Sequence, residues 1–231
     1  MMELYSLNRA GRLPEDIFSR LLKSVGSEKK EKICSFHKWE DAHRTLFADL
    51  LIRFCIARKT GFPPEMLVFS TNAFNKPVLK NRDDLHFSLS HSGDWVVCAV
   101  DRQPVGVDIE EIRSVDEPLL RSCLSEEEHR ALLKTSPSKR LSHFYTLWTL
   151  KESYLKAVGK GLWMPLDSFS ILYPRKGRIA LFSGGKSCPH VYFKTYTVDS
   201  RYAMAVCTFH RRIPDSPVVL SVKDIFEFFL K

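Results

Sequence analysis

The stretch Pro104-Val-Gly-Val-Asp-Ile-Glu110 predicts a short β-strand in which apolar and polar residues alternate. Successive strand residues point to opposite faces, so the Asp108 and Glu110 carboxylates leave from one face. Two neighbouring carboxylates repel each other unless a cation lies between them. Magnesium is a hard cation that proteins often hold through one or two carboxylates plus substrate phosphates. The alternative is that these acids form the polar outer face of an edge strand.

A second stretch, Trp148-Thr-Leu-Lys-Glu-Ser-Tyr-Leu-Lys-Ala-Val-Gly-Lys-Gly161, predicts the end of a helix, because its glycines favour a C-terminal stop. Trp148, Glu152 and Lys156 are spaced by four and therefore share one helix face. Glu152 is a candidate third carboxylate for the same metal ion, and Lys156 follows one turn later.

Together these two motifs resemble the paired signature of the 4′-phosphopantetheinyl transferases. The resemblance is closest to the surfactin-synthetase-activating (Sfp-like) type, in which one chain carries both halves of the fold. The similarity covers residues from about 27 to about 208 and includes three further motifs: Glu28-Lys-Lys-Glu-Lys32, Glu40-Asp-Ala-His-Arg-Thr45 and Phe87-Ser-Leu-Ser-His-Ser-Gly93.

The resemblance implies an α+β fold of two similar α/β halves related by a pseudo-two-fold, with the active site at their interface. We expect residues 1–103 to supply the coenzyme A nucleotide contacts. Residues 104–231 are expected to supply the metal-binding carboxylates and the catalytic helix. A weak internal similarity agrees with two related halves, since Phe87–Val100 aligns without gaps on Phe193–Val206.

The implied reaction moves the 4′-phosphopantetheine arm of coenzyme A onto a serine of an acyl or peptidyl carrier protein and releases 3′,5′-ADP. By the same resemblance, Mg²⁺ would be held by Asp108, Glu110 and Glu152 and would act as a Lewis acid on the diphosphate. Glu152 is the first candidate for the base that takes the serine proton. Lys156 would stabilise the diphosphate or orient Glu152.

The resemblance also implies a set of coenzyme A contacts. These are Lys29 and Lys32 at the 3′-phosphate, Arg44 and Thr45 near the adenosine, and Lys76, Ser90, His91 and Lys156 at the phosphates. Simpler interpretations remain open for several of them. The two helical lysines could form a solvated face, Arg44 could pair with Glu40 or Asp41, and His91 could close a turn.

Local patterns predict several further elements. Residues 13–25 and 40–58 are expected to be helices, the second ending at Gly61, and residues 66–70 a strand. Ser125 and Glu128 have the spacing of a capping box, which assigns the nearby acids to a helix start rather than to a metal cluster. Residues 222–230 are expected to form a terminal helix. Asn75, where the family more often has glycine, can adopt a left-handed turn.

The composition sets outer limits on the class of protein. The chain has 231 residues, of which 44% are hydrophobic, so a substantial core can form. It lacks an apolar run of about 18 residues and a signal-peptide pattern, so we expect a cytoplasmic protein without a membrane partner. Its six cysteines include no C-x-x-C pair, so we expect neither zinc nor disulfides. A chain that holds both halves is expected to be a monomer.

The formal net charge of +8 suits an anionic partner, and an acidic carrier protein would satisfy it. A basic nucleic-acid-binding protein is the main non-enzyme alternative, but the sequence has no recognised nucleic-acid-binding motif. A metal-dependent nuclease would explain both the carboxylates and the charge. A simple interaction module would bind neither coenzyme A nor nucleic acid.

Overall fold

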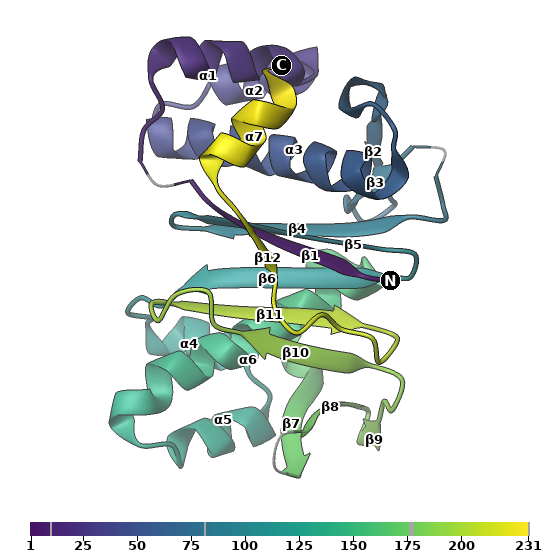
Figure 1. Ribbon diagram of the computed structural model, residues 1–231. Coiled ribbons are helices and arrows are strands. Elements are labelled where there is room, and N and C mark those ends of the chain that lie inside the picture. The colour runs from purple at the N-terminus through teal and green to yellow at the C-terminus, as the bar shows by residue number, and fades with distance from the viewer. Residues whose placement is uncertain (10, 81, 176–177, 231) are drawn as a thin grey trace.

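Two β-sheets lie against each other at the centre of the molecule, and a long helix packs on the outer face of each sheet (Figure 1). The computed structural model describes residues 1–9, 11–80, 82–175 and 178–230. Between the sheets lies an apolar layer that takes residues from both, including Leu4 and Val97 from one and Val107 and Val206 from the other. The result is a mixed α/β fold of four layers.

The first sheet has the strand order β12-β1-β5-β4, in which β1 pairs parallel to β12 and antiparallel to β5. Its strands are β1 (Glu3–Asn8), β4 (His86–Ser92), β5 (Trp95–Asp101) and β12 (Val218–Leu220). The helices on its outer face are α1 (Glu15–Leu21), α2 (Ser27–Cys34), α3 (Trp39–Thr60) and α7 (Val222–Phe229).

The second sheet has the order β10-β11-β6, and both of its pairings are antiparallel. Its strands are β6 (Val105–Glu111), β10 (Tyr192–Tyr196) and β11 (Tyr202–Thr208). The helices of this half are α4 (Glu117–Cys123), α5 (Glu126–Leu133) and α6 (Pro137–Val158). Two small sheets complete the described fold: β2 (Phe69–Thr71) with β3 (Pro77–Leu79), and β7 (Phe169–Arg175) with β8 (Arg178–Ser183) and β9 (Lys186–Ser187).

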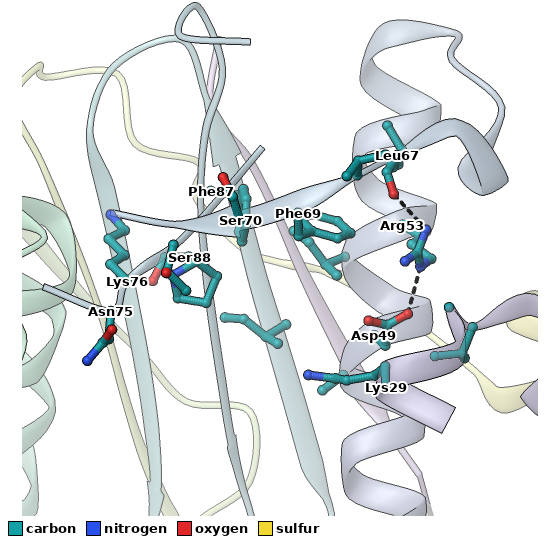
Figure 2. A pocket seen from close by; sticks show the side chains of 18 of the residues that line it. Lys29, Asp49, Arg53, Leu67, Phe69, Ser70, Asn75, Lys76, Phe87 and Ser88 are labelled. Carbon is teal, nitrogen blue, oxygen red and sulfur yellow. Dashed lines mark hydrogen bonds and ion pairs between the residues drawn. The ribbon is translucent and has the colours of Figure 1, made fainter. Parts of the chain in front are cut away.

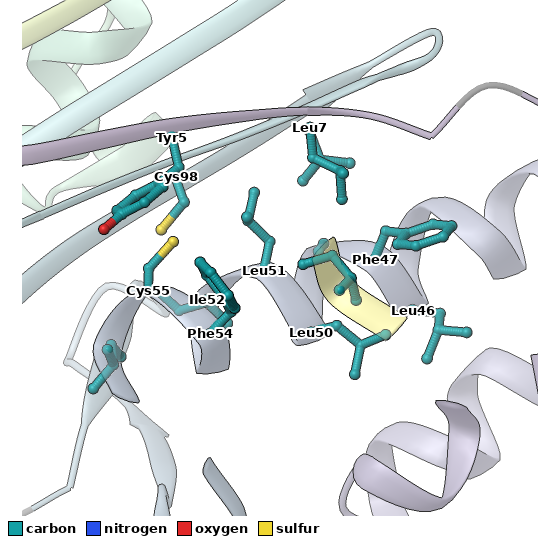
Figure 3. Close-up of a cluster of buried hydrophobic side chains, with 14 of the residues drawn as sticks. Tyr5, Leu7, Leu46, Phe47, Leu50, Leu51, Ile52, Phe54, Cys55 and Cys98 are labelled. Carbon is teal, nitrogen blue, oxygen red and sulfur yellow. The ribbon is translucent and has the colours of Figure 1, made fainter. Parts of the chain in front are cut away.

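Helix α3 provides most of the apolar surface that covers the first sheet. Leu46, Phe47 and Leu50 are fully buried against Leu7 and neighbouring residues of β1 and β5 (Figure 3). The helix ends where the sequence predicts, because Gly61 adopts a left-handed conformation with φ 76° and its N–H bonds to the Ala57 carbonyl. Burial on the order of 2 kcal/mol per large apolar side chain makes this interface a major source of stability.

Helix α6 packs unusually closely on β6 because Gly106 has no side chain. A Cβ atom placed on Gly106 would lie 1.8 Å from the Ser153 carbonyl oxygen and 2.6 Å from the Ala157 nitrogen. Gly106, Asp108 and Glu110 share the strand face that points at α6. This close approach therefore sets the position of the helix relative to the two acids.

The C-terminal segment returns to the first half of the molecule. Strand β12 extends the first sheet beside β1, and α7 buries Ile225 in the same core as α3 (Figure 1). The predicted terminal helix at 222–230 is present as α7 and is capped by Ser221 and Asp224. The expected second half, residues 104–231, therefore contains a C-terminal segment that packs with the first half.

Several local predictions are confirmed and two are wrong in detail. The capping box of Ser125 and Glu128 is present at the start of α5, and Asn75 has φ 63°. The helix expected over 13–25 is shorter, since α1 is followed by a 3₁₀ turn at Leu22–Ser24. The strand expected over 66–70 is β2 at Phe69–Thr71, preceded by a 3₁₀ turn at Pro64–Met66, where prolines favour a turn.

Two further expectations concern the environment of the chain. All six cysteines are free thiols, and Cys98 and Cys207 are buried in strands. Within the described ranges, every helix is too short or too polar to cross a membrane.

We expect Gly106→Ala to destabilise the protein by about 2 kcal/mol or more, because the added methyl group must push α6 away from β6. Urea denaturation measures the change. Gly26→Ala is the matched control, since a Cβ there has nothing within 4 Å and should cost at most about 1 kcal/mol. Equal losses in the two variants would contradict the close-packing account.

Candidate active site

Strand β6 is an edge strand of its sheet, and its free edge faces serine side chains of β4. The Ser88 hydroxyl accepts the Val107 N–H at 3.0 Å, and the Ser92 hydroxyl accepts the Glu111 N–H at 3.0 Å. Alternate residues of a strand share a face, so Ser88 and Ser92 of β4 both point toward β6. Hydroxyl groups thus join the two halves at this edge.

The Lys156 ammonium lies at the centre of the contact between the halves. It donates to Asp108 Oδ1 at 2.6 Å and to Ser90 Oγ at 2.8 Å, and Ser90 itself donates to Asp108 Oδ1 at 2.8 Å. Lys156 and Asp108 belong to the second half, and Ser90 belongs to β4 of the first. The contact therefore joins a cation, a carboxylate and a hydroxyl from three separate elements.

Glu110 and Glu152 are near neighbours of Asp108. Burial, followed by the negative charge of Asp108, raises the pKa of Glu110 to about 7. The same two causes raise the pKa of Glu152, and the positive charge of Lys156 partly opposes them. Grouped carboxylates of raised pKa have an unfavourable charged form, which a bound cation would stabilise.

The fit of these acids to a metal ion rests on Asp108. The Asp108 side chain is almost fully enclosed, and its buried Oδ2 atom has no hydrogen-bond partner. A bound cation would supply the missing partner. In the described part of the chain, no three His, Cys, Asp or Glu side chains are gathered closely enough to hold a metal ion as they stand. The donor chemistry thus suits a hard cation, and the three carboxylates would have to draw closer together around it to complete the ligand set.

A cavity of about 1410 Å³ opens beside this cluster. Its walls come from α2, α3, the β2–β3 hairpin, β4 and the C-terminal half of α6, and Figure 2 shows Lys29 and Lys76 among its lining side chains. Of the predicted site residues, those in the lining are Lys29, Lys32, Lys76, Glu152 and Lys156. The lining includes five lysines that reach it from both halves, so the cavity suits an anionic molecule.

Lys76 is held at the C-terminal end of α6. Its ammonium donates to the Lys156 carbonyl at 2.5 Å, where the helix dipole favours a cation. Asn72 ties the same hairpin to α6 by donating to the Gly159 carbonyl at 3.0 Å. Burial, followed by the nearby charge of Lys156, lowers the pKa of Lys76 to about 8.

The charges of three basic residues, each from a different helix, act on His91. The side chain lies at the exposed end of β4. Partial burial lowers its pKa first, and the positive charges of Arg44, Lys156 and Lys29 lower it further. The three cations give this end of β4 a positive field, which would attract phosphate groups.

The other predicted residues lie outside the cavity lining. Arg44 and Thr45 are half-buried in the first turns of α3, and Arg44 has the alternative ion pair with Asp41 at 3.6 Å. Ser90 and Asp108 are connected to the cavity through Lys156. Glu110 is connected to β4 through Ser92, whose hydroxyl donates to Glu110 Oε2 at 2.8 Å.

Sequence reasoning missed two buried ion pairs. Arg53 donates to Asp49 Oδ2 at 2.6 Å, and Figure 2 shows this pair in the cavity wall. Their spacing of four within a helix was the only available signal. Lys151 and Glu128 form a fully buried pair at 2.5 Å, and Lys151 also donates to the Phe169 carbonyl. This pair ties α6 to α5 and β7 beside Glu152, and nothing local in the sequence connects its members.

Comparisons with known proteins identify the family of this chain. A family model described as the 4′-phosphopantetheinyl transferase superfamily matches residues 104–207, and one described as 4′-phosphopantetheinyl transferase, N-terminal, matches residues 14–103. The 4′-phosphopantetheinyl transferase Sfp of Bacillus subtilis is 37% identical over 97% of this chain and 100% of its own length. The 4′-phosphopantetheinyl transferase gsp of Aneurinibacillus migulanus is 30% identical over 100% of this chain and 96% of its own.

Among solved structures, a holo-(acyl-carrier-protein) synthase from Bacillus anthracis in complex with CoA covers 47% of this chain and 96% of its own, with a TM-score of 0.40 and 21% identity. The two sequence relatives match over nearly the whole of both chains. The protein is therefore a transferase enzyme. It belongs to the 4′-phosphopantetheinyl transferase family, of the Sfp-like type.

The lowered pKa of Lys76 predicts a pH dependence of stability. Its ordinary value is 10.5 and its value in the folded protein is about 8, so between these pH values the unfolded chain holds a proton that the folded protein lacks. The free energy of unfolding should therefore rise with pH across this window, by up to roughly 3 kcal/mol.

Urea denaturation of the parent and Lys76→Met between pH 7 and pH 10.5 tests this expectation. The stability of the parent relative to the variant should increase as the pH rises through 8 and above. A difference between the two proteins that stays constant across this window would contradict the buried-lysine account.

Proposed function

We propose that this enzyme transfers the 4′-phosphopantetheine arm of coenzyme A to a serine hydroxyl of an apo acyl or peptidyl carrier protein, with Mg²⁺ as cofactor and 3′,5′-ADP as the second product. Family membership supports the reaction class. The observation that carries the proposal is the contact of Lys156 with both Ser90 and Asp108, which joins the lysine-lined cavity to the buried carboxylates.

The chemistry requires charge neutralisation and alignment. A serine oxygen must attack the β-phosphorus of a diphosphate that already carries negative charge, so the barrier falls mainly through positioning and electrostatics. In the proposal, Lys29 and Lys32 hold the 3′-phosphate, with Arg44 and Thr45 near the adenosine. Lys76, Ser90, His91 and Lys156 hold the diphosphate, and the lysine ammonium groups supply a positive charge at its oxygens.

We assign Asp108, Glu110 and Glu152 as the residues that would hold Mg²⁺. A bound Mg²⁺ would supply Lewis-acid stabilisation of the charge on the diphosphate. Glu152 is assigned as the base that accepts the serine proton on a carboxylate oxygen. Its place in the cavity lining, one helix turn before Lys156, supports this role.

We further propose that the two halves are related by a pseudo-two-fold with the active site between them. The strand orders β1-β5-β4 and β6-β11-β10 support this relation. In each half a 22-residue helix separates the first strand from an antiparallel strand pair. Helix α3 comes between β1 and β4–β5, and α6 comes between β6 and β10–β11. Because one chain supplies both halves, we propose a monomer, and the cytoplasmic location remains a prediction.

An acidic carrier protein is the proposed macromolecular partner. The net charge of +8 supports it, because opposite charges speed encounter and make it sensitive to salt. The docking surface is proposed to include the region between residues 115 and 140, which connects the two metal-binding segments. Nucleic acid is not proposed as a partner, and nuclease activity is the alternative outcome to test.

The direct test uses mass spectrometry of an apo carrier protein after incubation with enzyme, Mg²⁺ and coenzyme A. The carrier should gain the mass of one phosphopantetheine arm. In Asp108→Ala the metal site loses a ligand. The barrier to transfer should therefore rise by at least about 3 kcal/mol, which lowers the rate more than a hundred-fold.

A parallel incubation with DNA and RNA separates the alternative functions. The proposal expects both nucleic acids to remain intact under the same conditions. Metal-dependent cleavage without any mass gain on the carrier would favour the nuclease. Near-normal transfer by Asp108→Ala would show that Asp108 does not hold the metal.

A further inference from the structure

One hydrogen bond at the seam between the halves reaches a proposed metal ligand. The Ser92 hydroxyl donates to Glu110 Oε2 at 2.8 Å and accepts the Glu111 N–H at 3.0 Å. A backbone N–H can only donate, so that bond uses an acceptor position of the hydroxyl. The single hydroxyl proton is left to point at the Glu110 carboxylate.

The turn that follows Ser92 is fixed to the second half. Gly93 has φ 52°, and a Cβ there would lie 2.1 Å from the Tyr202 hydroxyl oxygen and 2.7 Å from Glu111 Oε2. The Asp94 N–H donates to the same Tyr202 hydroxyl at 3.1 Å. Arg9 holds this turn from the other side through an ion pair with Asp94 at 3.1 Å. The two residues that follow Ser92 are therefore held in place by Tyr202 and Arg9.

We propose that Ser92 is a positioning residue that orients the Glu110 carboxylate for the metal ion. The inference rests on the proposed function, since it assigns Glu110 to the metal. The terminal torsion of a glutamate is soft, and the nearby charge of Asp108 repels the carboxylate. A donor on one carboxylate oxygen limits this freedom, as partners behind metal ligands do elsewhere.

The chain offers a matched control on the same strand face. The Ser88 hydroxyl accepts a β6 backbone N–H at 3.0 Å, as Ser92 does, but it makes no hydrogen bond to any carboxylate of the described residues. Ser88→Ala and Ser92→Ala therefore remove the same kind of seam contact. Only the second also removes a donor to Glu110.

The experiment measures binding of Mn²⁺ by electron paramagnetic resonance, with saturating coenzyme A, to the parent, Ser92→Ala, Ser92→Thr and Ser88→Ala. We expect Ser92→Ala to weaken Mn²⁺ binding about ten-fold or more. Ser92→Thr keeps the hydroxyl and should bind within about three-fold of the parent, and so should Ser88→Ala. Melting temperatures identify any variant that has lost its fold.

The transfer assay adds an independent measure. In Ser92→Ala the Mg²⁺ concentration for half-maximal rate should rise, while KM for coenzyme A at saturating Mg²⁺ stays near that of the parent. If the folded Ser92→Ala variant binds Mn²⁺ as the parent does, or if Ser88→Ala loses as much, the positioning role is wrong. If the parent neither binds Mn²⁺ nor transfers the arm, the proposed function fails instead.

Discussion

The contact between β4 and the free edge of β6 is the constraint on which the rest of the structure depends. An edge strand presents N–H groups that are costly to bury without partners. Here Ser88 and Ser92 supply those partners through side chains, where β6 lacks a second strand. The same strand face carries Ser90 and its bond to Asp108. Hydroxyl groups on one face of β4 therefore join the halves, and two of them, Ser90 and Ser92, also bond to acids of the site.

This arrangement divides the electrostatic work between the halves. The second half contributes the acids of β6 and α6, whose carboxylates are enclosed at the close contact set by Gly106. The first half contributes lysines of α2 and of the β2–β3 hairpin around the cavity. Lys156 lies between the two sets and bonds to both sides. The second half supplies the acids and Lys156, and the first half supplies the other lysines of the proposed site that line the cavity.

The sequence predicted the features that depend on local pattern. Gly61 ends α3, the capping box of Ser125 begins α5, and the alternation around Asp108 produces β6, because each follows from the conformational preferences of a few neighbouring residues. The family resemblance named the residues of the candidate site but could not place them. Arg44, for example, has both an ion pair with Asp41 and a place in the positive field around His91.

What could not be predicted depends on contacts between distant residues. The bond of Ser92 to Glu110 needs the packing of two sheets, and no periodicity in either segment encodes it. The return of β12 and α7 to the first half follows from the apolar surface left beside β1. The most direct test of the account is coenzyme A binding measured by calorimetry at increasing Mg²⁺ concentration, because a shared site requires reciprocal coupling. The affinity should rise with Mg²⁺ in the parent and not in Asp108→Ala. An affinity that is independent of Mg²⁺ in the parent would contradict a single site built by both halves.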